Sequence, residues 1–456
     1  MGVGCVDVRI EAGRITEIAR KIDPQPGEPI IDAAGGALLP GLHDHHIHLL
    51  SLAKALDSIQ CGTPDICNEA QLVALLRQHA AITPDDGRWM RGIGYHESIA
   101  GEIDRAWLDR VVPNRPLRIQ HRGGRLWMLN SAGIVRISAG HAASHPGVDL
   151  VRGRFQDADD WLRTLLPDVR PSLRHASALL AQRGVIGVTD ATPTNGLPEC
   201  QYFADEHARG YLLQDVLVMG GAELDRAERH EGVAVGPTKI HLHESALPDF
   251  DSLCATIRHS HATGRAVAVH CVTVAELVFA ASALAEAGHR VGDRIEHASL
   301  APPEALRLLA DQGITVVTQP NFVFERGDTY RVEIPAREQP WLYRGHGFLD
   351  HGIPLAAGTD APFGNPDPWL AMSAAVGRRT RNGYCLNEDE AISPEQALAL
   401  FTGPALLPGS PSRKIAVGAP ASFCLLDRPW QEARQGLGAV QVTATVNAGR
   451  FIHGPQ

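Results

Sequence analysis

The sequence predicts an α/β fold, a TIM-like (β/α)8 barrel, and two observations along its 456 residues predict it. Short apolar segments rich in Val, Ile and Leu recur eight times through the chain. Segments with apolar residues spaced by three and four, as in helices, follow most of them. Parallel strands buried on both faces are continuously apolar, and eight such strands alternating with helices close into a barrel.

The predicted strands are short and apolar, and several are followed by polar residues. They span residues 36–43, 185–191, 213–219, 236–243, 265–270, 292–297, 314–319 and 353–359. Four of the segments between them predict helices, at 197–210, 250–264, 274–288 and 302–313. Three of these four begin at or next to Pro or Asp, and several end in Gly, as helices commonly do.

The predicted barrel, residues 36–409, is much longer than the roughly 250 residues that such a barrel needs. The excess lies at about residues 50–183, between the first and second predicted strands. This segment contains Trp89, Trp107 and Trp127, together with Pro and Gly turns. We therefore expect a large insertion after the first strand that forms a cap over one end of the barrel.

Both ends of the chain predict short β-strands. The N-terminal strands alternate around a turn at Glu11-Ala12-Gly13, and a second β-rich stretch runs from about 416 to 452. Residues 1–35 and 410–456 are therefore expected to form one small β-sandwich domain beside the barrel.

Composition narrows the range of partners and locations. Hydrophobic residues make up 44% and charged residues 21%, and the net charge is −10, as in an ordinary globular protein. The chain contains no Lys/Arg-rich run, so we expect no nucleic-acid partner. It has no apolar run of about 18 residues and no signal-peptide pattern, so we expect no membrane association. Eight dispersed cysteines without a CxxC pair favour reduced thiols in a cytoplasmic protein.

The strongest local motif is the histidine-rich stretch 40–48, PGLHDHHIH. Alternate residues of a strand share a face, so Asp44, His46 and His48 point the same way. They lie near the carboxyl end of a barrel strand, where barrel enzymes keep their active sites. Two imidazoles so placed can hold one metal ion. By itself, the motif is also compatible with a histidine-rich turn.

Later strands add polar residues at the same end of the barrel. His270, His297 and Asp360 each follow an apolar strand, and Lys239 lies within the fourth. Any one of them is more often an ordinary polar residue at a strand end. Taken with the histidine motif, the five strands would bring their polar ends to one point of a barrel, which indicates a metal site.

Lys239 raises a separate question, because burying a charged lysine is costly unless it is paired or neutral. Reaction with CO₂ would give a carbamate, an anion that can bridge two metal ions. The alternative is an ion pair with Asp360 or another carboxylate. His241 and His243 share the strand face of Lys239, so either could be a ligand or a substrate contact.

With these residues the sequence resembles the amidohydrolase superfamily, in the branch of N-substituted formamide deformylase and related N-acyl deacylases. The matching stretches extend over nearly the whole chain and include PGLHDHHIHL, RWMRGIGYHES, GVIGVTDATP, GPTKIHLHES, VAVHCVT, RIEHASL, VVTQPNF and GIPLAAGTDAPFGNPDPW. The ordered set of HxH, Lys, His, His and Asp makes the resemblance highly specific.

The resemblance implies a metal-dependent hydrolase with one or two divalent ions. It implies His46 and His48 on the first metal, Lys239 as an N6-carboxylated bridge, and His270 and His297 on the second. Asp360 would bind beside the metal and act as the catalytic acid and base. Zinc is the expected ion, with iron or manganese as alternatives for such ligands.

The substrate side departs from the family pattern. Arg125 stands five residues before Asn130, where relatives often have His, and His243-Glu244-Ser245 replaces an Asp-Gly pair. The candidate substrate contacts are Arg125, Tyr95, His96, Gln319, Asn321 and His243. An arginine in the insertion could bind a carboxylate through two hydrogen bonds, but it could equally form a surface ion pair.

Three functions remain open. We favour hydrolysis of an acyclic N-acyl or formamide bond in a small molecule. A cyclic amide hydrolase or an aminohydrolase (deaminase) on the same barrel is the second. Many deaminases of this superfamily have a Glu soon after the histidine of the fifth strand, whereas here the nearest one after His270 is Glu276, about a turn further on. A non-catalytic binding protein is the third. The sequence leaves a homodimer open.

Overall fold

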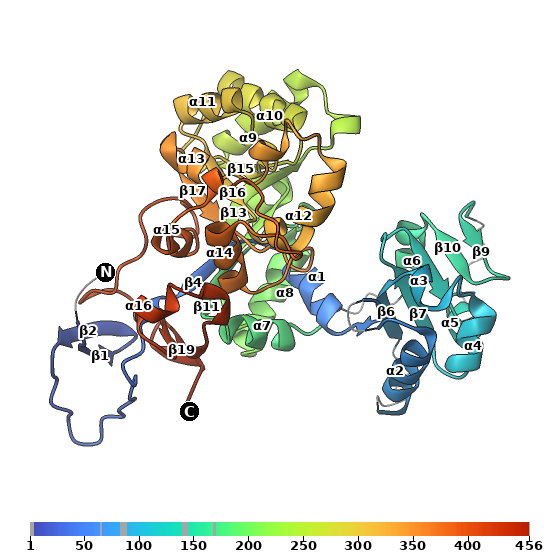
Figure 1. Ribbon diagram of the computed structural model, residues 1–456, viewed down its shortest axis with the longest axis horizontal. Coiled ribbons are helices and arrows are strands. Elements are labelled where there is room, and N and C mark those ends of the chain that lie inside the picture. The colour runs from blue at the N-terminus through green and yellow to red at the C-terminus, as the bar shows by residue number, and fades with distance from the viewer. Residues whose placement is uncertain (1–3, 64–65, 83–88, 139–144, 167–169, 456) are drawn as a thin grey trace. The chain divides into compact units, whose positions relative to one another are not determined.

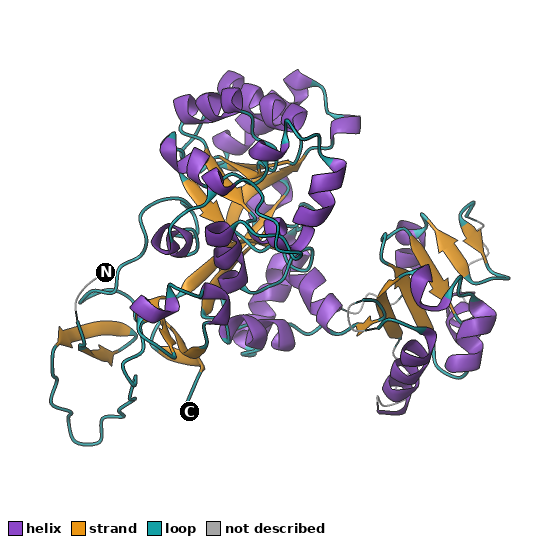
Figure 2. Ribbon diagram, in the orientation of Figure 1, coloured by secondary structure: helices purple, strands orange, loops and turns teal. Residues whose placement is uncertain are grey.

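The computed structural model describes residues 4–63, 66–82, 89–138, 145–166 and 170–455 (Figure 1). The chain divides into two compact units, one formed by Met1–Leu49 and Leu173–Gln456 and the other by Leu50–Ser172. The first unit contains a parallel sheet with helices and a set of short antiparallel strands, and the second contains a mixed sheet with helices of its own (Figure 2).

Eight parallel strands form the barrel of the first unit, and their order in the sheet follows their order in the chain. They are β4 (Leu42–Ile47), β11 (Val185–Asp190), β12 (Asp215–Gly220), β13 (Val233–His241), β14 (Val267–Cys271), β15 (Arg294–His297), β16 (Thr315–Thr318) and β17 (Leu355–Ala357). Two hydrogen bonds close the ring just beyond the last strand. The Asp360 amide donates to the His46 carbonyl at 2.8 Å, and the His48 amide donates to the Ala361 carbonyl at 2.9 Å. The predicted barrel is confirmed.

Helices follow the strands around the barrel (Figure 1). They are α7 (Arg174–Ala181), α8 (Leu197–Ala208), α9 (Phe250–Ala262), α10 (Val274–Ala287), α11 (Pro303–Gln312), α12 (Asn321–Glu333), α13 (His346–Asp350), α14 (Pro368–Gly377) and α15 (Pro394–Ala399). Local sequence explains their ends: Thr273 and Glu276 form a capping box at the start of α10, and Gly313 ends α11 with φ of 64°. The four predicted helices are α8 to α11.

The predicted first strand, 36–43, was wrong in its bounds. Its first half is β3 (Leu38–Pro40), which pairs antiparallel with β18 (Phe423–Leu426) outside the barrel, and the barrel strand starts only at Leu42. The chain changes sheets at Pro40-Gly41. A Cβ on Gly41 would lie 2.6 Å from a side-chain carbon of Ile186, so only glycine permits this close passage.

Both ends of the chain build one small β module. The hairpin of β1 (Asp7–Glu11) and β2 (Arg14–Ala19) lies against a four-stranded sheet ordered β20 (Arg450–His453), β19 (Val442–Asn447), β18 and β3. Ile15 of the hairpin packs with Phe423 and Val446 of the sheet. Burial of these apolar side chains joins the two sheets. The short helix α16 (Trp430–Ala433) connects β18 to the last two strands.

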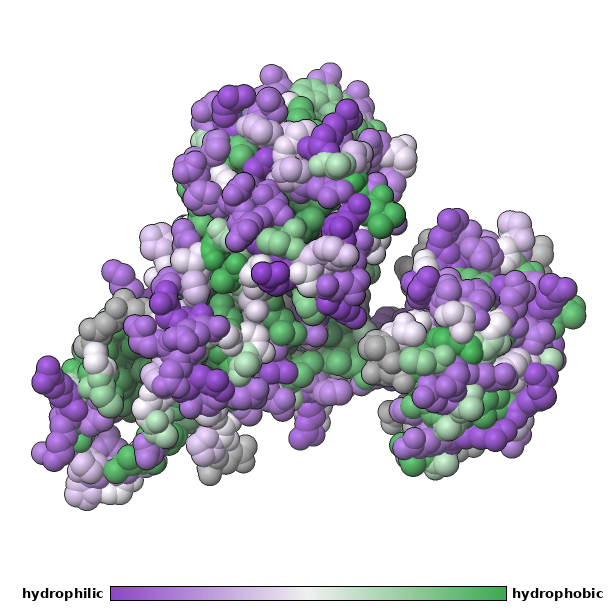
Figure 3. Space-filling model, in the orientation of Figure 1, coloured by the Kyte–Doolittle hydropathy of each residue, from purple (hydrophilic) through white to green (hydrophobic). Residues whose placement is uncertain are grey.

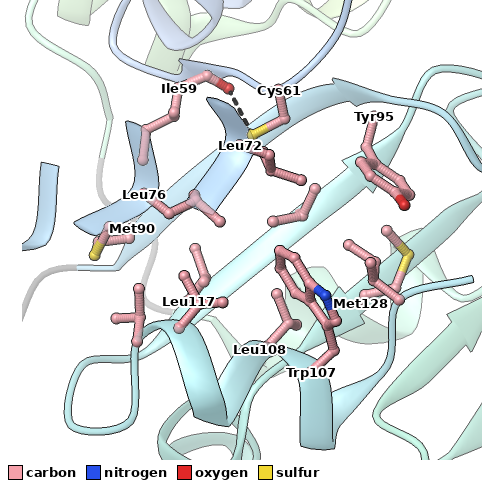
Figure 4. Packing of buried hydrophobic residues seen from close by; sticks show 14 of the residues in the cluster. Ile59, Cys61, Leu72, Leu76, Met90, Tyr95, Trp107, Leu108, Leu117 and Met128 are labelled. Carbon is pink, nitrogen blue, oxygen red and sulfur yellow. Dashed lines mark hydrogen bonds between the residues drawn. The ribbon is translucent and has the colours of Figure 1, made fainter. Parts of the chain in front are cut away.

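The insertion, Leu50–Ser172, has a hydrophobic core of its own. Its sheet is ordered β5 (Ile59–Gln60), β6 (Met90–Tyr95), β7 (Leu117–His121), β8 (Leu126–Leu129), β10 (Arg154–Gln156) and β9 (Val148–Asp149). Its helices are α2 (Glu69–Ile82), α3 (Glu97–Ala100), α4 (Arg105–Val111), α5 (Ser131–Ser138) and α6 (Asp159–Leu165), and α1 (Leu49–Leu56) leads into it from the barrel. Figure 4 shows Tyr95, Trp107 and Met128 within this core. The expected cap over the barrel stays a prediction.

The surface of the protein and its cysteines agree with what the composition of the sequence indicates. Hydrophilic and hydrophobic residues are mixed over the visible face of each unit (Figure 3). Within the described ranges, no helix is long and apolar enough to cross a membrane. All eight cysteines are free thiols.

Candidate metal centre

Strand β4 separates its histidines onto two faces, as its alternation predicts. His43 packs beside Gly187, and its Nε2 lies 2.9 Å from the hydroxyl of Thr189 on the neighbouring strand. His46 and His48 belong to the other face. The end of β17 approaches them closely, since a Cβ on Gly358 would lie 2.4 Å from the backbone nitrogen of His46.

Three side chains at this end of the barrel form a compact group of possible metal ligands, His46, His48 and Asp360. The Nε2 atoms of the two histidines lie 3.6 and 3.2 Å from Asp360 Oδ1. Within the described chain Oδ1 accepts no hydrogen bond, and His46 and Asp360 are both buried. Ligand atoms that converge without hydrogen bonds to one another fit a cation between them.

Neighbouring residues fix which nitrogen of each imidazole faces this group. His46 Nδ1 is hydrogen-bonded to the carboxylate of Glu296, and His48 Nδ1 lies 2.8 Å from the hydroxyl of Thr192. A carboxylate only accepts, so His46 carries its ring proton on Nδ1 and keeps the Nε2 lone pair free. Ligating histidines commonly have such a partner on their second nitrogen. Sequence reasoning missed Glu296 and Thr192.

The signal for Glu296 was available in the sequence. Arg294 and Glu296 alternate on one face of a fully buried strand, and the Arg294 Nε donates to Glu296 at 2.7 Å. Two charges on the inward face of so short a strand indicate a buried ion pair with a role in the site. For Thr192, the sequence offers no comparable signal.

Asp44 occupies the base of this site. It is fully buried and accepts hydrogen bonds from the Thr359 amide and hydroxyl, at 3.0 and 2.5 Å, and from the His46 amide at 3.1 Å. Burial raises the pKa of Asp44 to about 7, against the effect of these hydrogen bonds. Asp44 thus connects β4 to the residues just before Asp360.

The two later histidines join the first two in a row of rings. The ring centroids of His46 and His297 are 4.7 Å apart, and those of His297 and His270 are 4.5 Å apart. His241 stacks on His270 at 4.2 Å. His297 and Asp360 both have positive φ, 70° and 55°, a strained backbone conformation that is frequent at functional sites.

Burial keeps the imidazoles neutral. It lowers the pKa of His46 and His297 well below the usual value and that of His270 to about 3. A neutral imidazole is the form that binds a metal. At neutral pH these side chains are therefore in the ligand form.

Lys239 lies among these groups without a partner. It is 7% exposed, and its Nζ makes no hydrogen bond to any described residue. Its positive charge contributes to lowering the pKa of His46, His270 and His297. Burial lowers its own pKa, which Glu296 opposes. The ion pair with Asp360 that the sequence left open is not formed in the described structure.

Two of the candidate substrate contacts are buried at the end of β16. The Gln319 amide donates to the Val317 carbonyl, and Asn321 Nδ2 donates to the Thr359 carbonyl at 3.0 Å. The side-chain oxygens of both residues have no partner in the described chain. His243, in contrast, is exposed and caps a short turn by accepting from the Ser245 amide.

The candidate contacts in the insertion are engaged within that unit. Arg125 is exposed and donates to both oxygens of Asp157, at 2.5 and 2.8 Å, which is the surface ion pair considered as the alternative. Tyr95 is buried and donates its hydroxyl to the Gly101 carbonyl. Their proposed contact with substrate finds no support in these partners.

His96 belongs to a second group of possible ligands, with Glu97 and His121. Both imidazoles accept a backbone amide at Nδ1, from Ser98 at 3.2 Å and from Gly123 at 3.0 Å. The ring protons of the neutral rings are then on Nε2, which faces Glu97. This half-exposed group is thus an imidazole–carboxylate cluster without free nitrogen lone pairs.

Comparison with known proteins identifies the family of the chain. The model of a family described as the amidohydrolase family matches residues 29–453. The chain belongs to the amidohydrolase family. This amidohydrolase is 26% identical to the N-substituted formamide deformylase of Arthrobacter pascens, over 96% of this chain and 93% of that protein.

Solved structures share its fold. A metal-dependent hydrolase from Pyrococcus horikoshii has a TM-score of 0.73 at 20% identity, covering 92% of each chain. One from Pyrococcus furiosus has a TM-score of 0.74 at 21% identity, covering 92% of this chain and 94% of the other. Family membership makes the chain a hydrolase that acts on carbon–nitrogen bonds, and His46, His48 and Asp360 form a candidate metal site.

Proposed function

We propose that this amidohydrolase cleaves an acyclic N-acyl or formamide bond of a small molecule, with Asp360 as acid and base. The observation that carries the proposal is the group of His46, His48 and Asp360, whose facing atoms are close but not hydrogen-bonded to one another. The Arthrobacter pascens relative supports the formamide class. The reaction consumes one water and gives a carboxylic acid and an amine.

The donor set fits a divalent metal. Neutral imidazoles and a carboxylate suit zinc first and iron or manganese next. The Nε2 atoms of His46 and His48 face Asp360, and His270 and His297 lie in the same row of rings. A bound ion would supply a Lewis acid that activates water and polarises the substrate carbonyl.

Lys239 supports a site for two ions. A buried amine with no hydrogen-bond partner and a lowered pKa is more nucleophilic than a surface lysine, since more of it is unprotonated. Carboxylation by CO₂ would give it an anionic group among three neutral histidines. We propose that Lys239 is N6-carboxylated and that its carbamate would be a ligand in a site for two ions.

Asp360 is the residue that we propose moves the proton. Its Oδ1 accepts no hydrogen bond within the described chain, and its backbone amide is fixed to the His46 carbonyl at 2.8 Å. In the proposed reaction Oδ1 takes a proton from the attacking water and then gives it to the departing nitrogen. Protonating that nitrogen lets the carbon–nitrogen bond break with a neutral amine as product.

The partners of Glu276 weigh against the deaminase alternative. The carboxylate of Glu276 accepts from the backbone amides of Glu244 at 2.8 Å, Val272 at 2.7 Å and Thr273 at 3.1 Å. A carboxylate with three backbone partners supports the two loops that it connects, and a proton-transfer role would cost those bonds.

An activity screen with parallel metal analysis tests the proposal. N-formyl amines, N-acyl amino acids and cyclic amides are assayed for amine release, and metal is measured by elemental analysis. We expect turnover of an acyclic class and between one and two equivalents of metal. Turnover restricted to cyclic amides would refute the substrate class, and full activity in metal-free protein would refute the mechanism.

A further inference from the structure

A cleft of about 300 Å³ lies on the barrel unit beside the metal centre. Residues of α12, of the loop after β17, of α14 and of the loop after α14 line it, among them Asn321, Phe324, Glu325, Phe363, Leu370 and Arg381. The Phe363 ring meets the His48 ring edge-on at 5.4 Å between centroids. A molecule in this cleft would therefore extend from the metal ligands along the barrel surface.

The walls of the cleft are aromatic. Phe363 is 58% exposed and Phe324 is 40% exposed, and both are hydrophobic residues that a folded chain usually buries. Leu370 adds a third apolar side chain. Exposed apolar groups in a concave surface next to a reactive centre are typical of a ligand pocket. A flat apolar ring would remove these surfaces from water.

One charge in the cleft has no hydrogen-bonded partner. The guanidinium of Arg381 makes no hydrogen bond or ion pair with a described residue, and it lies 5.7 Å from the centre of the Phe324 ring. Its backbone is fixed by an amide hydrogen bond to the Phe324 carbonyl at 3.0 Å. The nearby Arg326 differs, because it donates to the Phe363 carbonyl at 2.8 Å.

One oxygen of the carboxylate in the cleft is already engaged. Glu325 Oε1 accepts from the Asn365 amide at 2.9 Å and from Asn321 Nδ2 at 3.3 Å. Those contacts hold the loop after β17 against α12. Arg381 is the cation among the described residues that line the cleft, and a carboxylate is the group that a guanidinium binds best.

Asn321 connects the cleft to the catalytic loop. It is 1% exposed, its Nδ2 donates to the carbonyl of Thr359, and its side-chain oxygen has no partner in the described chain. Thr359 directly precedes Asp360. Asn321 thus connects the wall of the cleft to the residue before Asp360.

We infer that the cleft binds the amine part of the substrate, and that this part carries an aromatic ring and a carboxylate. The inference rests on the proposed function. In a formamide or other small N-acyl compound the bulk lies on the amine side, and Asp360 delivers its proton to that amine. The substrate class is then an N-formyl or short N-acyl aromatic amino acid, with its ring between Phe324 and Phe363 and its carboxylate on Arg381.

Calorimetric binding to the full-length enzyme tests the cleft without any turnover. The probes are 3-phenylpropanoate, which has the ring and the carboxylate, and 3-phenylpropan-1-ol, which has the ring alone. We expect Arg381→Gln to raise the Kd of 3-phenylpropanoate about fivefold and to leave that of the alcohol unchanged. Phe324→Ala should raise both. Arg337→Gln, whose side chain is 83% exposed and outside the cleft, is the matched control and should change neither.

Other results would overturn the inference. It fails if 3-phenylpropanoate does not bind, if Arg381→Gln leaves its Kd unchanged, or if the control variant weakens binding equally. A carboxylate that binds only to the metal centre would give the second of these results.

Kinetics separate this inference from the proposed function. Three substrates are compared. N-formylphenylalanine has both the ring and the carboxylate, N-phenethylformamide has the ring alone, and N-formylalanine has the carboxylate alone. We expect N-formylphenylalanine to have the highest kcat/KM, and Arg381→Gln to remove its advantage over N-phenethylformamide. Turnover of all three compounds at equal kcat/KM would refute the cleft and leave the proposed function intact. Binding of 3-phenylpropanoate that depends on Arg381, without hydrolysis of any amide, would refute the function and leave the cleft intact.

Discussion

Replacing Glu296 by Gln tests whether the residues behind the metal ligands control metal binding. Glu296 is fully buried and has two roles, since its carboxylate accepts hydrogen bonds from His46 Nδ1 and from the Arg294 Nε. Loss of the carboxylate behind a ligating histidine weakens metal binding by about 10–100-fold, or about 1.4–2.7 kcal/mol. Loss of the counter-ion of buried Arg294 destabilises the fold by about 3 kcal/mol.

A second buried ion pair supplies the control. Glu390 is 4% exposed and pairs with Arg344 away from the metal ligands, so Glu390→Gln breaks a pair of the same kind. Both variants should lose a similar free energy of unfolding in urea titrations. Metal affinity, measured by competition with a chelator, should fall only in Glu296→Gln. Equal metal affinity in the two variants would refute the orienting role of Glu296.

Four further outcomes are expected. Asp360→Asn should keep most of its metal and lose about 10²–10⁴-fold in kcat, and full activity would remove Asp360 from the mechanism. Lys239→Ala should lose at least one equivalent of metal by elemental analysis, and unchanged metal content would argue against a bridge. Burial lowers the pKa of His270 from 6.5 to about 3, so between these pH values the unfolded chain binds a proton that the folded chain does not. Urea midpoints should therefore fall as the pH decreases from 6.5 towards 3, and a midpoint constant over that range would contradict the burial of His270. Arg125→Ala should leave kcat/KM unchanged, since Arg125 pairs with Asp157 on the surface, and a large rise in KM would restore its role as a substrate contact.

The barrel and the convergence of its polar strand ends could be predicted from sequence, because both depend on short-range periodicity. Residues two apart on a strand share a face, and parallel strands end at one rim, so His46, His48 and Asp360 meet. The partners behind them depend on which strands become neighbours across the barrel. Glu296 reaches His46 over 250 residues of chain, a contact that no local pattern encodes.

The insertion and the first strand are two regions whose structure the periodicity of the sequence does not predict. Tyr95 lies in a motif that resembles the family, yet it packs into the core of the insertion, and sequence spacing does not reveal which side of its strand is buried. The apolar run at 36–43 is continuous, so the change of sheet at Gly41 is visible only through the close passage of Ile186. The roles of Lys239 and His270 stay predictions that await metal analysis.

The pairing of β3 with β18 has a consequence for biosynthesis. Strand β3 leads through one glycine into the strand with the first histidines, but its partner β18, at Phe423–Leu426, is synthesised only after the whole barrel. During translation the edge of β3 stays open until β18 has been made. A nascent chain stalled before residue 423 would expose that edge, and premature termination there should give an aggregation-prone product.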